Sequence, residues 1–150
     1  MKLIGEFFHP GRPKGKGRPR FGAGGHAFTP AQTRLAEDSL GYSALQARPD
    51  KPTDKPLFVG IVFRHPVPKS WPKWKRELCE QGMVYQTSTP DLDNQVKLVL
   101  DALNHAGWWD DDKQISWLQA CAVHGDKPGV HVRVAELPSP DDQRHRGPID

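Results

Sequence analysis

LFVGIVFRH, residues 57 to 65, is the stretch that decides the fold of this 150-residue chain. It is almost wholly apolar up to Phe63, and a short continuous apolar run of this kind predicts a strand that is buried on both faces. We therefore expect this strand at the centre of a sheet. The length of the chain allows one domain with a modest core.

The segments around this strand predict helices and further strands. Residues 2–8 and the segments 114–125 and 129–137 are expected to be strands, the last two joined by the turn GDKPG. Helices are expected over 31–47, opened by Thr29 or Pro30, over 71–80, and over 92–105, ended by Gly107. This order predicts an α+β fold, a single domain with a mixed sheet packed against helices.

Two segments are expected to lie outside this packed unit. Residues 10–28 are rich in Gly, Pro and Arg and predict a long, basic, mobile loop within a domain that spans 1–137. Residues 138–150 carry almost no apolar side chain and predict a disordered tail.

The helix predicted over 92–105 has one apolar face and one polar face. The apolar positions are Leu92, Val96, Val99, Leu100 and Leu103, and the polar ones are Asp93, Lys97, Asp101, Asn104 and His105. The tryptophans that follow, Trp108 and Trp109, are expected to serve packing.

The composition excludes several classes of protein. No apolar run approaches the ~20 residues of a membrane span, and the N-terminus MKLIGEFFHP does not have the pattern of a signal peptide. We therefore expect a soluble, cytoplasmic protein that makes no membrane contact. Cys79 and Cys121 lack CxxC spacing, which predicts reduced thiols in place of a zinc site or a disulfide framework.

Positive charge is concentrated in two segments, although the net charge is only +3. These are residues 12–20 and residues 69–76. The second segment is interleaved with Trp71 and Trp74, as suits a surface that binds phosphates and unstacked bases. The predicted DNA-binding residues are Arg12, Lys14, Lys16, Arg18 and Arg20 in the first segment, and Lys69, Lys73, Lys75 and Arg76 in the second.

Acidic residues gather at both ends of the 92–105 helix: Asp91 and Asp93 at its start, Asp110 to Asp112 after its end. If the chain folds back at Gly107, Asp112 approaches Asp93, and such an oxygen-only set selects Mg²⁺ or Mn²⁺. A metal held in this way supports phosphodiester hydrolysis, with Lys97 placed beside the phosphate.

Simpler interpretations remain open for each of these residues. Asp93 can cap the helix, Lys97 can form a solvated pair with Asp93 or Asp101, and the triple aspartate can be a solvated turn. In that case the chain is a non-catalytic DNA-binding protein.

The segments PDLDN, LDAL and GWWDDDKQI, with Lys97 between the first two, resemble the signature of the RusA family of Holliday junction resolvases. KGRPRFGAGGHAFTPAQTR and VPKSWPKWKR extend the resemblance over roughly residues 10 to 135. The family's acidic pair corresponds to Asp111 and Asp112, and Asp110 is an additional acid at a position where the family more often has a hydrophobic residue. The third metal ligand can therefore be Asp110, Asp111 or Asp112. The ungapped count from Asp93 favours Asp112.

The resemblance implies a homodimeric crossover junction endodeoxyribonuclease that acts on branched DNA in recombination and repair. It implies Asp91, Asp93 and Asp112 as ligands of Mg²⁺, for which Mn²⁺ can substitute, and Asp111 as a possible ligand. It further implies Lys97 as a residue needed for catalysis, and two opposing strands nicked symmetrically. A nuclease that cuts flaps or replication forks would share all of these residues.

Overall fold

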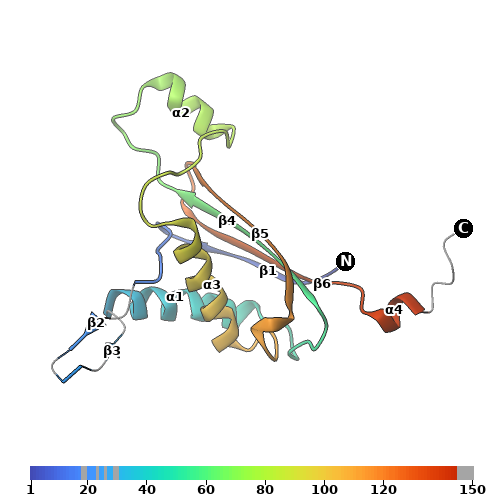
Figure 1. Ribbon diagram of the computed structural model, residues 1–150. Coiled ribbons are helices and arrows are strands. Elements are labelled where there is room, and N and C mark those ends of the chain that lie inside the picture. The colour runs from blue at the N-terminus through green and yellow to red at the C-terminus, as the bar shows by residue number, and fades with distance from the viewer. Residues whose placement is uncertain (18–19, 23, 26, 29–30, 145–150) are drawn as a thin grey trace, which may run out of the picture.

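The computed structural model describes residues 1–17, 20–22, 24–25, 27–28 and 31–144, with residues 20, 21, 27 and 28 described by their backbone alone. Its main sheet contains β1 (Lys2–Pro10), β6 (Gly129–Glu136), β4 (Leu57–His65) and β5 (Ile115–His124) in that spatial order (Figure 1). Strand β4 is parallel to β5 and antiparallel to β6. The sheet is therefore mixed, and the α+β prediction is confirmed.

The predicted central strand does lie inside the sheet, between β6 and β5. Its alternate side chains Leu57, Val59, Ile61 and Phe63 are buried, and those between them are half-buried. Strands β5 and β6 follow one another in the chain, yet β4 separates them, so the turn at 125–129 does not close a hairpin. The most apolar strand takes this place because it gains most from neighbours on both sides.

Helices α1 (Ala31–Ala47) and α3 (Leu92–Ala106) lie together on one side of the sheet (Figure 1). The α3 side chains Val96, Val99 and Leu103 are buried as predicted. Leu92 is 40% exposed, so its place on the buried face was wrong; as the first residue of the helix it precedes the turns that α3 buries. Gly107 ends α3 with φ 80°, a left-handed conformation that suits glycine.

Both tryptophans after α3 belong to the core, as predicted. Trp108 is fully buried and its indole N–H donates to the Ala44 carbonyl at 2.8 Å. The Trp109 indole N–H donates to the Asn104 Oδ1 at 3.0 Å. These bonds satisfy the only polar atom of each ring, so the rings tie the end of α3 to α1 and to α3 itself.

Short elements lie outside this core. Helix α2 (Lys73–Glu80) projects beyond one end of the sheet (Figure 1). Strands β2 (Arg20–Phe21) and β3 (Ala27–Phe28) pair within the predicted basic loop, whose mobility stays a prediction. Thr29 and Pro30, predicted to open α1, lie outside the described residues.

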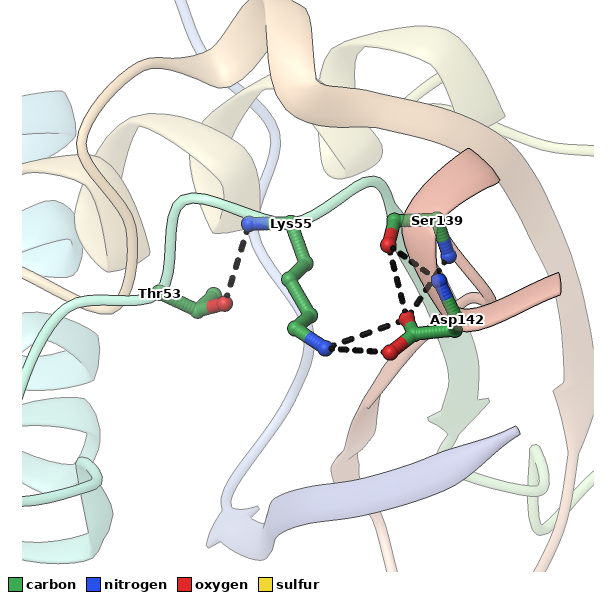
Figure 2. A network of polar contacts seen from close by, with 4 residues as sticks. All are labelled: Thr53, Lys55, Ser139 and Asp142. Carbon is green, nitrogen blue, oxygen red and sulfur yellow. Dashed lines mark hydrogen bonds and ion pairs between the residues drawn. The ribbon is translucent and has the colours of Figure 1, made fainter. Parts of the chain in front are cut away.

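Part of the predicted disordered tail is helical, as α4 (Pro140–Arg144). Figure 2 shows why this helix forms beside the sheet: the Asp142 carboxylate accepts from the Ser139 backbone N–H at 2.9 Å and pairs with the Lys55 ammonium at 3.1 Å. The Ser139 hydroxyl also donates to Asp142, at 2.8 Å. Local capping and one ion pair thus replace the apolar burial that the tail lacks. Residues 145–150 lie outside the described part.

Among the described residues, none of the helices combines the length and the apolar character that a membrane crossing requires.

Candidate functional site

Asp91 and Asp93 both lie exposed where the chain enters α3. Asp91 occupies the N-cap position with φ −63° and ψ 150°, yet its side chain makes no capping hydrogen bond. Asp93 lies in the first helical turn, so the alternative that Asp93 caps the helix is wrong. The positive end of the α3 dipole favours negative charge at this place, and both carboxylates face solvent.

A buried glutamine supports this pair of carboxylates. The Gln95 side chain is fully buried, and its amide nitrogen donates to the carbonyl of Pro90 at 2.8 Å and to Oε1 of Gln86 at 3.2 Å. Its Oε1 accepts from Nε2 of His65 at 2.7 Å. Gln95 thereby joins the segment before Asp91 to the end of β4. Sequence reasoning missed it, because a single glutamine within an amphipathic helix carries no sign of burial.

Burial makes His65 a neutral donor in this network. The pKa of His65 is lowered from its ordinary value of 6.5, first by desolvation, although the hydrogen bond to Gln95 acts in the opposite direction. Neutral imidazole has one N–H, and Gln95 receives it at Nε2. The uncharged ring therefore holds Gln95 without placing a cation beside the two aspartates.

Asp112 lies at the opposite end of the sheet from this pair. Gln114, two residues later, donates from its amide nitrogen to the carbonyls of Thr53 and Lys55, just before β4 begins. Asp93 instead lies near His65, where β4 ends. A nine-residue strand is about 26 Å long, and the α3 helix about 20 Å.

The expectation that one chain folds back to bring Asp112 to Asp93 is therefore wrong. Within the described residues no three acidic, histidine or cysteine side chains gather as metal ligands. The physical reason is that the chain enters β5 soon after Gly107, and β5 is parallel to β4. It therefore starts beside the start of β4, whereas Asp93 lies near the end of β4. A single chain offers two of the three predicted ligands for Mg²⁺ at one place.

The three consecutive aspartates differ in their surroundings. Asp111 caps a short 3-10 turn, Asp112–Gln114. Its Oδ1 accepts from the Lys113 backbone N–H at 2.9 Å, and the backbone N–H of Asp111 donates to Oε1 of Gln114. The Lys113 N–H is the first cause that lowers the pKa of Asp111. Asp110 and Asp112 are exposed and take no part in this capping box. Of the three predicted candidates, Asp111 is therefore the one held by local capping, and Asp110 and Asp112 are not.

Two lysines near the carboxylates have different situations. Lys97 is exposed on α3, one turn after Asp93, and the described part of the chain contains no ion pair of Lys97 with Asp93 or Asp101. Asp101 instead pairs with Lys16, whose backbone N–H donates to the Asn94 carbonyl at 3.0 Å. The basic loop therefore runs against the start of α3, and Lys16 neutralises a protein carboxylate.

The other predicted DNA-binding residues of the loop are only partly described. Arg12 and Lys14 are exposed. Arg18 lies outside the described residues, and of Arg20 only the backbone in β2 is described.

The second basic segment presents one tryptophan to the protein and one to solvent. Trp71 packs edge-on against the ring of His124 at 4.7 Å, and the Lys75 ammonium lies 3.7 Å over the Trp71 ring. Trp74 is 63% exposed. Lys69, Lys73 and Arg76 are exposed as well. This segment therefore offers cations and one free aromatic face, the combination that suits phosphates and unstacked bases.

Comparison with known proteins identifies the family of this chain. The model of the endodeoxyribonuclease RusA family matches residues 10–135. The chain is 33% identical over 132 residues to the uncharacterized protein YqaN of Bacillus subtilis (strain 168), an alignment that covers 85% of this chain and 92% of that protein. It is 29% identical over 103 residues to the crossover junction endodeoxyribonuclease rusA of Lactococcus phage r1t, covering 66% of this chain and 70% of the phage protein. The chain therefore belongs to the RusA endodeoxyribonuclease family and is a nuclease.

Proposed function

We propose that this nuclease resolves four-way DNA junctions by paired symmetric nicking, in recombination and repair. The observation that carries the proposal is the exposed pair Asp91 and Asp93 at the start of α3, with both basic segments beside it. Lys16 bonds the Asn94 carbonyl on one side. On the other side the Gln86 N–H donates to the Ala122 carbonyl, near the end of β5, where His124 contacts Trp71.

We further propose that the third carboxylate is Asp112 of the partner subunit. One chain separates its own Asp112 from Asp93 by the length of the sheet, whereas a homodimer has a second copy to supply it. Strand β5 is an edge strand, and among the described residues its outer edge is covered at the end alone, where the His124 N–H donates to the Val84 carbonyl and the Gln86 N–H donates to the Ala122 carbonyl, both at 2.9 Å.

Antiparallel pairing of the uncovered parts of two β5 edges would bring the start of one strand up to the covered end of the other. The end of β5 lies next to His65 and therefore near Asp93 of the same chain. The partner's β5 starts three residues after Asp112 of the partner subunit. A two-fold axis through β5 thus brings the separated carboxylates together twice, once for each strand to be cut.

The donor set fits a hard divalent cation. Asp91, Asp93 and Asp112 supply only carboxylate oxygens, as Mg²⁺ prefers and Mn²⁺ accepts. When bound, such an ion activates water and stabilises charge on the phosphate. Lys97 lies one turn after Asp93 and places its ammonium beside the same phosphate. Arg12, Lys14, Lys69, Lys73 and Arg76 bind the DNA backbone around it.

The test is cleavage of a labelled synthetic four-way junction beside duplex, flap and fork controls, with Mg²⁺ or with EDTA. The wild type should cut the junction in paired positions, and EDTA or Asp93→Asn should abolish this. Asp38→Asn, an exposed carboxylate on α1 with no assigned role, is the matched control and should cut normally. An intact junction that is still bound would leave a non-catalytic DNA-binding protein. Preferential cutting of flaps or forks would change the substrate and keep the chemistry.

A further inference from the structure

A cavity of about 580 Å³ lies between the basic loop, α1, α3 and the inner face of the sheet. This volume lies within the ~300–1,000 Å³ of typical small-molecule pockets. Its floor and walls are largely apolar and come from four elements: Phe63, Val130, Leu35, Leu40, Leu98 and Val99. The folded chain leaves this space open although it adjoins the core, so it suits a flat apolar group.

The mouth of the cavity is basic. Arg12 and Lys14 line it and are exposed. Neither has an ion pair in the described part of the chain, in contrast to Lys16. An apolar interior below two free cations matches a nucleotide, whose base is flat and whose phosphate is anionic.

The cavity also contains polar groups that can meet the edge of a base. Nδ1 of His9 is 2.7 Å from the Ser43 hydroxyl, and Nε2 lies 3.5 Å from that of Ser39. Burial lowers the pKa of His9, which keeps the ring neutral at neutral pH. Gln32 lies at the same wall with both an amide donor and an acceptor.

The cavity is adjacent to the carboxylates along α3. Leu98 lines the cavity five residues after Asp93, an axial rise of about 8 Å. The loop connects the same two places, because Arg12 and Lys14 lie at the cavity and Lys16 bonds Asn94. Phosphates of one strand are spaced by about 3.4 Å along a duplex axis, so the cavity lies within a few nucleotides of a phosphate at Asp93.

We propose that this cavity receives one unpaired nucleobase of the branched DNA, close to the phosphate that is cut, with its own phosphate on Arg12 and Lys14. The proposal rests on the proposed function and adds the site that reads sequence. An extruded base must give up stacking, and the apolar walls replace those contacts. The strands at the centre of a branched substrate have such bases to offer, which links base reading to branch recognition.

The test uses four-way junctions with the fluorescent base 2-aminopurine at successive positions around the crossover. The full-length chain carries Asp93→Asn, so that the DNA stays uncut. We expect a several-fold rise in fluorescence at one position on binding, because the base leaves its stack and the described cavity lining contains no tryptophan. Ala36→Phe, which fills the cavity from α1, should abolish the rise and leave junction affinity within about twofold.

Two further variants separate loss of the pocket from loss of the fold. Ser39→Phe fills the cavity from an exposed position, in case Ala36→Phe unfolds the chain. Ala31→Phe adds the same ring on α1 away from the cavity and should retain the rise. A rise that survives both filling variants would overturn the proposal, as would the absence of any rise despite tight binding. These readouts need no cleavage, so failure of the nuclease assignment would be seen separately, in the junction assay.

Discussion

Activity should return when two inactive variants, Asp93→Asn and Asp112→Asn, are mixed. In the proposed dimer each site takes Asp93 from one chain and Asp112 from the partner subunit. A heterodimer therefore has one site with both lesions and one site with none. Re-equilibrated equal mixtures contain half heterodimers, so about one quarter of all sites should be intact.

The assay is single-turnover nicking of a labelled four-way junction, with heterodimers measured by exchange of a tag. The mixture should nick at about a quarter of the wild-type amplitude, and the products should carry single nicks, because each active dimer has one site. A mixture of Asp91→Asn with Asp93→Asn is the matched control: both lie at the start of α3, so every site keeps a lesion. The reasoning is refuted if heterodimers form and the first mixture stays inactive, or if both mixtures recover equally.

Three further predictions concern the buried Gln95, its neighbour His65 and the second basic segment. Gln95→Leu leaves the Pro90 carbonyl and His65 without their hydrogen-bond partner, so the free energy of unfolding in denaturant should fall by roughly 1–3 kcal/mol. The control Gln143→Leu, at an exposed position, should change it by less than about 0.5 kcal/mol. An equal effect of both variants would contradict the role of Gln95. Burial lowers the pKa of His65 below 6.5, so on acidification the imidazole of the unfolded chain takes up a proton before that of the folded chain. The contribution of His65 to stability is therefore complete above about pH 6.5 and is lost as the pH falls toward the lowered pKa. His65→Gln should reduce the difference in unfolding free energy between pH 7.5 and pH 5.5. Lys69→Gln combined with Arg76→Gln should reduce the slope of log affinity against log salt by about two, because each phosphate contact contributes about 0.9. The slope is measured by junction binding from about 50 to about 200 mM salt. An unchanged slope would show that this segment does not contact the DNA.

Local sequence signals predicted most elements because each is determined by nearby residues. The continuous apolar run at 57–65 required burial on both faces and became the strand between β6 and β5. The 3.6-residue period after Leu92 and the glycine at 107 marked α3 within one residue at its end. The helix at Pro140–Arg144 was missed, because the tail has almost no apolar side chain and the Lys55 ammonium that holds Asp142 is distant in sequence.

The sequence by itself determined the resemblance to the RusA family and the residues that we propose carry its chemistry: the two carboxylates at the start of α3, Lys97 one turn later, and the basic segments. These are matters of residue type and short spacing, which a linear pattern retains. Only the tertiary structure decided where Asp112 lies, since the parallel pairing of β4 with β5 places it at the far end of the sheet. It also decided that Gln95 is buried against His65, because the partners of a polar side chain depend on which distant segments the fold brings to it.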